Sequence, residues 1–156
     1  SPHSIELMLK HGFVYDSSMM GDDFMPYYAR QGDVIALEQR AAFGAESPLV
    51  EMPIHWSTDD SPHYEFVRAE ASLRQGLKNA HHVEQNWVDD FRHMRESVAW
   101  GVLTYTCHPF ISGRGHRIMV LDRLIQQLKS EGAVFMRVDE AVQAFKRRHP
   151  PTPVFR

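Results

Sequence analysis

Residues 102–117 read Val102-Leu103-Thr104-Tyr105-Thr106-Cys107-His108-Pro109-Phe110-Ile111-Ser112-Gly113-Arg114-Gly115-His116-Arg117. The apolar, β-branched run at 102–107 predicts a strand, and Pro109 ends it because proline cannot donate a hydrogen bond to a sheet. In alternating α/β folds, the carboxyl ends of strands and the loops after them carry the chemistry. A histidine can exchange a proton near neutral pH, so His108 is the first candidate catalytic residue.

The sequence after this loop alternates between helix and strand. Apolar residues recur at helical spacing from Ile118 until just before Gly132, and a strand is predicted at 133–138. A last helix is predicted to begin with Asp139 as its N-cap. This order predicts an α/β fold with a mainly parallel sheet, open or closed into a barrel.

The first part of the chain predicts shorter elements. Ser1 and Pro2 suit the start of a helix that Gly12 would end, which is typical of a piece cut from a longer domain. Strands are expected at three places: 13–15, 34–37 and 49–56. A mostly helical pattern covers 64–99 with an interruption near Gly76, and its apolar face is predicted to be buried. The residues of that face are Trp87, Val88, Phe91, Met94 and Val98.

Composition excludes several classes of protein. The net charge of −3 over 156 residues gives no basic excess for a nucleic-acid partner. The basic run Lys146-Arg147-Arg148 is interpreted as a solvated helix terminus. No apolar run is long enough for a membrane helix, and no signal peptide is visible at the N-terminus. A single cysteine excludes a disulfide framework. These features are compatible with a cytoplasmic protein.

Two interpretations are open for His108 and for the loop that follows it. His108 is either a functional group or a hydrogen-bonded structural residue. Arg114 and Arg117 either contact a substrate or bind carboxylates and backbone carbonyls to shape the loop. Cys107 is predicted to face the packed layer if His108 faces a pocket, because successive strand residues point to opposite faces. A thiol nucleophile is therefore not expected.

A second loop, after the strand predicted at 49–56, contains Trp56, Asp59 and Asp60. A tryptophan with paired acids suits a pocket that stacks a ring and orients polar groups. The alternative is an Asx-turn in which Asp60 caps the segment after Pro62. The same two interpretations apply to Asp22 and Asp23. The ten histidines include no i, i+4 pair, so a complete metal triad within the chain is not expected.

Three groups of residues resemble the second half of polysaccharide deacetylase family domains. They are Ser1-Pro2-His3-Ser4 with residues 12–18 and Gly21-Asp22-Asp23, then residues 51–62, and then residues 107–117. The resemblance spans essentially the whole chain and keeps the order of the motifs. The nearest branch contains peptidoglycan-deacetylase-like, allantoinase-like and cyclic imide hydrolase enzymes.

The resemblance implies that residues 1–156 are the C-terminal portion of one catalytic domain with a distorted (β/α) barrel fold. It implies metal-dependent hydrolysis of non-peptide C–N bonds, in N-acetylated glycans or in cyclic amides and imides. His108 matches the family's general acid. Trp56 and Asp60 match a pocket wall, while Asp23 and Arg114 are expected to contact the substrate.

The family's catalytic base and metal ligands belong to motifs that would lie before Ser1. The resemblance therefore implies that a divalent metal, zinc in the first place, is bound by residues outside this chain. The expected partners are the missing N-terminal half of the domain and a small-molecule or glycan substrate, and the chain alone is expected to be inert.

Two alternatives to a half-enzyme are open. One is a non-catalytic module that binds a sugar or small ring through Trp56, Tyr27 and Tyr28. The other is a swapped half-barrel, whose open sheet edges would make it a homo-oligomer.

Overall fold

The computed structural model describes residues 3–65, 67–69, 72–74 and 76–151 and divides into two compact units. Unit 1 comprises Ser1–Pro53 and Met136–Arg156, and unit 2 comprises Ile54–Phe135. The helix start predicted at Ser1 and Pro2 lies outside the described residues. Among the described helices, none is long and apolar enough to cross a membrane.

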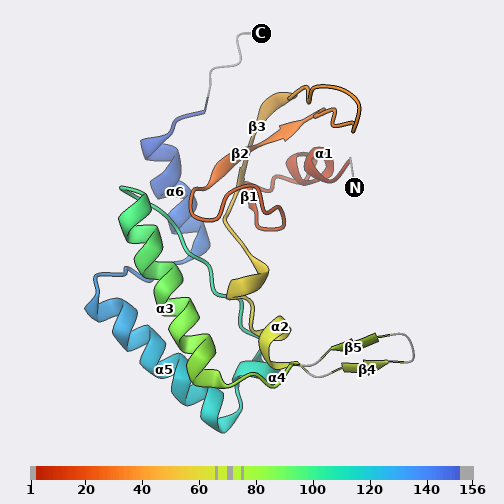
Figure 1. Cartoon of the computed structure of the whole chain (residues 1–156). Helices are drawn as coiled ribbons and strands as arrows, with labels where there is room; N and C mark the ends of the chain where they lie inside the picture. Colours follow the sequence, from red (N-terminus) through yellow and green to blue (C-terminus); the bar gives the residue numbers. More distant parts are fainter. Residues whose placement is uncertain (1–2, 66, 70–71, 75, 152–156) are drawn as a thin grey trace. The chain divides into compact units, whose positions relative to one another are not determined.

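Unit 1 contains a three-stranded sheet in the order β1-β3-β2 (Figure 1). Its strands are β1 Tyr15–Asp16, β2 Tyr27–Gln31 and β3 Ala45–Glu51. The central strand β3 is parallel to β1 and antiparallel to β2, so the prediction of a mainly parallel sheet is only partly correct. The strand predicted at 34–37 reduces to one bridge between Val34 and Ala42.

Two helices complete unit 1. Helix α1 covers Ser4–Lys10 and, as predicted, is followed by Gly12, which adopts a φ of 77° that favours glycine. Helix α6 covers Val138–Arg148, and its last turn holds the basic run, as predicted. Arg137, not Asp139, is the N-cap of α6; Asp139 lies in the first turn and binds the Arg137 guanidinium.

The core of unit 1 lies between α6 and the sheet. Val142 and the strand residues Leu49 and Val50 are completely buried. Phe145 packs on the ring of Tyr28 with 5.3 Å between the ring centroids. The Tyr28 hydroxyl donates to the backbone carbonyl of His149 at 2.8 Å, so Tyr28 belongs to the core of this unit.

Glu51 is a completely buried acid at the end of β3. Its Oε1 accepts hydrogen bonds from the backbone N–H groups of Ser18 and Met19, both at 2.6 Å. Its Oε2 is buried without a hydrogen-bond partner among the described residues. Burial raises the pKa of Glu51 above its ordinary value of 4.5, because the ionised form loses its hydration.

Replacing Glu51 with glutamine is expected to stabilise the chain at neutral pH relative to the wild type. Because the pKa of Glu51 is raised in the folded state, its favourable contribution is complete below the unfolded pKa and is lost as the pH rises through the folded pKa. Urea unfolding at acidic and neutral pH measures this difference. Glu46→Gln, on an exposed site of the same strand, is the control. An equal gain at both pH values would contradict the prediction.

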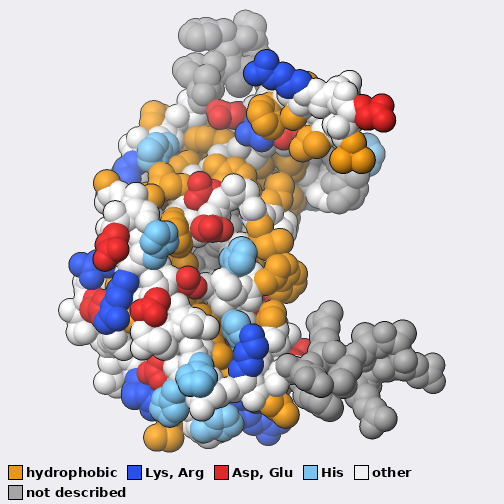
Figure 2. Space-filling view, viewed as in Figure 1, with side chains coloured by type: hydrophobic (Ala, Val, Ile, Leu, Met, Phe, Trp, Pro, Cys, Tyr) orange, Lys and Arg blue, Asp and Glu red, His pale blue; other side chains and the backbone are white. Residues whose placement is uncertain are grey.

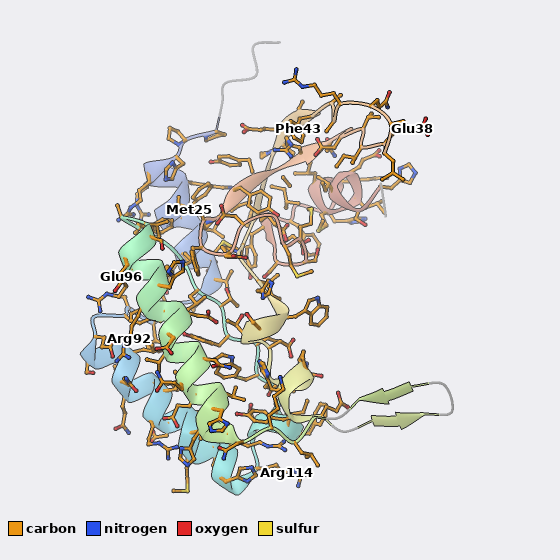
Figure 3. All side chains as sticks on the ribbon, viewed as in Figure 1. Met25, Glu38, Phe43, Arg92, Glu96 and Arg114 are labelled. Atoms are coloured by element: carbon orange, nitrogen blue, oxygen red, sulfur yellow. The ribbon has the colours of Figure 1, made fainter. Side chains whose placement is uncertain are left out.

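Unit 2 is built around two long helices, α3 Ala80–Ser97 and α5 Gly115–Ser130. As predicted, Trp87, Val88, Phe91 and Met94 of α3 are buried, whereas Val98, the fifth residue predicted for this face, is half-buried at the C-cap. Helix α5 buries Val120, Leu124 and Leu128, but Ile118, where the apolar repeat was predicted to begin, is exposed. Arg92 of α3, labelled in Figure 3, donates from Nη2 to Oε1 of Glu131, the C-cap of α5, at 2.7 Å.

Unit 2 begins with the 3-10 turn η1 Trp56–Thr58 and helix α2 Asp60–Tyr64. Strands β4 Val67–Ala69 and β5 Ser72–Arg74 replace the first part of the long helical region predicted at 64–99. The two strands pair with each other in an antiparallel hairpin. Gly76 closes it: a Cβ there would lie 2.0 Å from the carbonyl oxygen of Glu65, so only glycine fits. This close approach of two backbones explains why the helical pattern fails.

The strands predicted at 102–107 and 133–138 are also not formed. Residues 102–107 are extended, but their one described ladder contact is a parallel bridge between Thr106 and Asp59. Residues 133–137 are irregular, and Val134 and Phe135 are exposed. A strand requires a hydrogen-bonded neighbour, and the described residues offer these two segments no further one.

Side chains of opposite charge are interspersed over the face shown in Figure 2, with histidines among them. This mixed surface agrees with the small net charge of the sequence.

Candidate functional site

Two backbone segments of unit 2 lie side by side and bring the candidate residues together. The N–H of Thr106 donates to the carbonyl of Thr58 at 2.9 Å, and the N–H of Asp60 donates to the carbonyl of Thr106 at 3.0 Å. Each segment then enters a short helix: α2 begins at Asp60, and α4, Pro109–Ser112, has His108 as its N-cap. The bridge therefore places Asp60 and His108 at adjacent helix starts.

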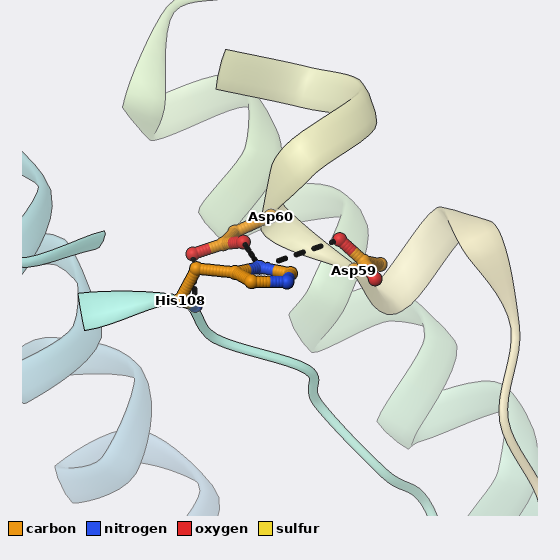
Figure 4. A group of neighbouring side chains, drawn as sticks. All are labelled: Asp59, Asp60 and His108. Atoms are coloured by element: carbon orange, nitrogen blue, oxygen red, sulfur yellow. Dashed lines mark hydrogen bonds and ion pairs between the residues drawn. The ribbon is translucent and has the colours of Figure 1, made fainter. Parts of the chain in front are cut away.

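The carboxylate of Asp60 accepts three hydrogen bonds, two of them from His108 (Figure 4). The His108 Nδ1 donates to Oδ1 at 2.6 Å, and the backbone N–H of His108 donates to Oδ2 at 2.8 Å. The Ser112 hydroxyl also donates to Oδ2. Asp60 is completely buried, whereas the His108 side chain is 38% exposed. The ring is therefore fixed through Nδ1, and its Nε2 carries no hydrogen bond to the described residues.

The electrostatic environment favours a protonated His108. Its hydrogen bond to Asp60 raises the pKa of the imidazole above the ordinary value of 6.5, and the charges of Asp60 and Asp59 add to the effect. Asp59 lies further away, with 3.9 Å between its Oδ1 and the His108 Nδ1. An imidazolium held at Nδ1 with an accessible Nε2–H is a suitable general acid.

Asp59 and Asp60 divide the two roles that were open for this loop. Asp59, not Asp60, caps helix α2, because its Oδ1 accepts from the N–H of Ser61 at 2.7 Å. The Asx-turn is thus present but belongs to the neighbouring residue. Asp60 turns inward from the first residue of α2 and binds His108.

The same three side chains are also a candidate group of ligands for a metal ion. Asp59, Asp60 and His108 offer ligand atoms within 4.8 Å of one another, and no other such group occurs in the described part of the chain. Both oxygens of Asp60 already accept hydrogen bonds, and a metal at Nδ1 would displace the proton that binds Oδ1. As arranged, the group fits a hydrogen-bonded acid–histidine pair and does not fit a metal cage.

The remaining predicted contact residues are not gathered in this group. Trp56 lies in the same unit, at the start of η1, and is 62% exposed. Arg114 is exposed where α5 begins (Figure 3). Asp23 is exposed on the loop of unit 1 that precedes β2. In that loop Asp22 forms an Asx-turn, accepting from the N–H groups of Phe24 and Met25.

Cys107 is exposed, which corrects the prediction that it faces a packed layer. The prediction was wrong because residues 102–107 do not form a strand with two alternating faces. Partial burial of the thiol, followed by the charge of Asp60, raises the pKa of Cys107. A raised pKa disfavours the thiolate, which is the nucleophilic form.

Sequence reasoning missed two residues that contact the pair. Ser112 is buried and donates to Asp60; a serine one turn after a histidine gives no distinctive signal. Phe110 meets the His108 ring edge-on, with 5.8 Å between the ring centroids, and is 64% exposed. The large apolar side chain directly after Pro109 was a signal in the sequence that could have indicated Phe110 as a neighbour of His108.

Known proteins support a specific relationship, although no family model matches the chain. The chain is similar to a peptidoglycan deacetylase of Helicobacter pylori, with 33% identity over 93% of this chain and 53% of the relative. It is also similar to a peptidoglycan deacetylase-like protein of Gibberella zeae, with 26% identity over 91% of this chain and 47% of the relative. The chain spans about half the length of these curated relatives.

The structural comparison agrees with the sequence comparisons. The fold is similar to the crystal structure of a protein from Mycobacterium smegmatis assigned as a polysaccharide deacetylase, with a TM-score of 0.73 and 26% identity. The match covers 99% of this chain and 49% of that chain. These similarities support a relationship of the chain to the polysaccharide deacetylase family.

Proposed function

We propose that the chain is the C-terminal half of a deacetylase-type domain that hydrolyses C–N bonds, with His108 as the general acid. The observation that carries this proposal is the buried Asp60 carboxylate, which binds Nδ1 of a His108 side chain that is 38% exposed and whose Nε2 has no hydrogen bond to the described residues. The names of the relatives favour an N-acetylated glycan of the peptidoglycan type as substrate. Ring opening of a cyclic amide or imide is the second substrate class and needs the same proton donor.

The proposed reaction adds one water molecule across the amide. The water oxygen forms a bond to the carbonyl carbon, and a base outside this chain accepts the water's proton. The C–N bond then breaks as Nε2 of His108 gives its proton to the leaving nitrogen. The products are a carboxylate and an amine, and the imidazole regains its proton from the base or the solvent. Asp60 stabilises the imidazolium before the transfer and keeps the ring oriented during it.

A divalent metal, zinc in the first place, belongs to this proposal with its ligands in the half of the domain that the relatives carry in addition. Such an ion lowers the pKa of a bound water. None of the steps assigned to His108 and Asp60 depends on it.

Trp56 is proposed to contact the substrate. An exposed indole four residues before Asp60 offers an apolar face on which a sugar ring can stack. Arg114, which is exposed in the same unit, is also proposed as a substrate contact, and Asp23 stays a prediction from the sequence. The proposed tyrosine contacts of a sugar-binding module are less suitable. Tyr28 is a core residue, and the Tyr27 hydroxyl accepts a hydrogen bond from the N–H of Gly21.

The function is tested with the complete protein, meaning this chain joined to the other half of the sequence that the relatives have. Acetate release from N-acetylated glycans and ring opening of a cyclic imide are measured with and without a chelator. We expect hydrolysis of one substrate class by the complete protein and none by the isolated chain. Calorimetry with the same glycans distinguishes the binding module: tight binding by the isolated chain, without hydrolysis by the complete protein, would contradict the proposal.

A further inference from the structure

Arg117 on the first turn of α5 connects the two short helices that carry the acid–histidine pair. Its Nη1 donates to the carbonyl of Ile111 in α4 at 3.0 Å, and its Nη2 donates to the carbonyl of Tyr64 in α2 at 3.5 Å. The guanidinium also lies over the Tyr64 ring, 4.5 Å from its centroid. Tyr64 and Ile111 are both buried, so these contacts are inside unit 2.

The two carbonyls that Arg117 binds lie near the C-terminal ends of their helices. Tyr64 is the last residue of α2, and Ile111 is the last but one residue of α4. Carbonyls in the last turn of a helix lack partners within the helix and carry partial negative charge, so a cation is favourable there. Asp60 and His108 lie at the opposite ends of the same two helices. One guanidinium thus joins the C-terminal ends of the two helices, whereas Asp60 and His108 lie at their N-terminal ends.

Two further features make an arginine specific for this place. A planar guanidinium can donate to two carbonyls and stack on an aromatic ring at the same time, whereas a lysine ammonium cannot do all three. The Arg117 Nε is buried without a hydrogen-bond partner among the described residues, so the polar contacts of the side chain go to the two helices. Arg114, three residues earlier, is exposed instead.

We propose that Arg117 is a positioning residue that holds α2 and α4 in the register in which Asp60 binds Nδ1 of His108. Its catalytic consequence rests on the proposed function of His108 as the general acid. Without Arg117, α2 and α4 lose one of their links and are joined mainly through Asp60, so the hydrogen bonds from His108 to Asp60 become longer and less populated. The expected result is a weaker acid–histidine pair in a chain that still folds around α3 and α5.

The variants Arg117→Met and Arg117→Lys test this role in two preparations. In the isolated chain, NMR titration of the His108 ring is expected to show a pKa that moves down toward the ordinary histidine value in Arg117→Met. In the complete protein, kcat is expected to fall about tenfold or more with KM changed less than about twofold. Arg117→Lys keeps the charge but not the three contacts, and we expect it to lie between the wild type and Arg117→Met.

Arg123→Met is the matched control. Arg123 lies on the same helix and binds Glu84 of α3 through two hydrogen bonds, at 3.1 and 2.8 Å, so its loss removes a comparable link that does not reach α2 or α4. We expect it to lower stability without changing the His108 titration or kcat. If Arg117→Met behaves like Arg123→Met in both readouts, the positioning role is wrong.

The titration separates this proposal from the proposed function. If the complete wild-type protein hydrolyses neither substrate class, the function fails, but the His108 titration in Arg117→Met still decides the positioning role. If Arg117→Met does not fold, the same titration in Arg117→Lys decides it, and an unchanged pKa there overturns the proposal.

Discussion

Replacing His108 with alanine or glutamine in the complete protein lowers kcat for C–N hydrolysis by about 10² or more. The reason is that the amine leaves poorly unless its nitrogen receives a proton, and Nε2 of His108 is the group that we propose supplies it. KM changes less, because the proton is transferred as the C–N bond breaks and not when the substrate binds. The measurement is steady-state acetate release at a pH below the pKa of His108.

The pH profile gives a second readout for the same variants. A general acid must be protonated, so wild-type kcat falls as the pH rises through the pKa of His108, which its contact with Asp60 raises. This basic limb is expected to disappear in His108→Gln. His116→Gln, at an exposed histidine in the first turn of α5, is the control and keeps both the rate and the limb. Full activity in His108→Ala would rule out the assignment.

The same contact links His108 to folding stability. Because its pKa is raised in the folded state, the contribution of His108 is complete below the unfolded pKa of about 6.5 and is lost as the pH rises through the folded pKa. The pH profiles of the wild type and His108→Gln are therefore compared only at pH values at which unfolding measurements show that both proteins are folded.

Helices were predictable from the sequence where their apolar residues repeat over several turns. The buried face of α3 follows from periodicity, because packing of one face dominates the energy of a long helix. The ends of α1 and α5 follow from Gly12 and Gly132, whereas α5 begins at Gly115, before the predicted apolar repeat from Ile118. Strands were less predictable. The runs at 102–107 and 133–138 have strand-like residues, but pairing depends on neighbours far away in the sequence, and the described residues supply too few.

The site was predictable in its residues but not in its pairing. His108 and Asp60 were both candidates on local grounds, a strand-end histidine and an acid in a turn. Nothing local indicates that residues separated by 48 positions share a hydrogen bond, because the Thr106–Asp59 bridge that aligns them is a long-range backbone contact. The exchange of roles between Asp59 and Asp60 has the same origin. Either acid can cap α2, and the position of His108 decides which one turns inward.

Asp60→Asn tests whether the carboxylate makes His108 an acid. Asparagine keeps the size of the side chain but has one acceptor oxygen, whereas Asp60 accepts from His108 Nδ1, its backbone N–H and the Ser112 hydroxyl. We expect kcat at neutral pH to fall about 10- to 100-fold, in the range found when a carboxylate that orients a histidine is removed. Buried donors left unpaired should also lower the free energy of unfolding by about 1–3 kcal/mol.

The pH dependence distinguishes loss of the acid from general damage. Without the carboxylate, the pKa of His108 should fall, so the basic limb of kcat moves to lower pH and part of the activity returns on acidification. Asp59→Asn is the matched control. Asp59 caps α2 and lies 3.9 Å from Nδ1. Because asparagine caps a helix about as well as aspartate, Asp59→Asn should leave the stability nearly unchanged and shift the limb much less than Asp60→Asn. Equal shifts in the two variants would mean that the summed negative charge of the loop, and not the hydrogen bond from His108 to Asp60, sets the acidity of His108.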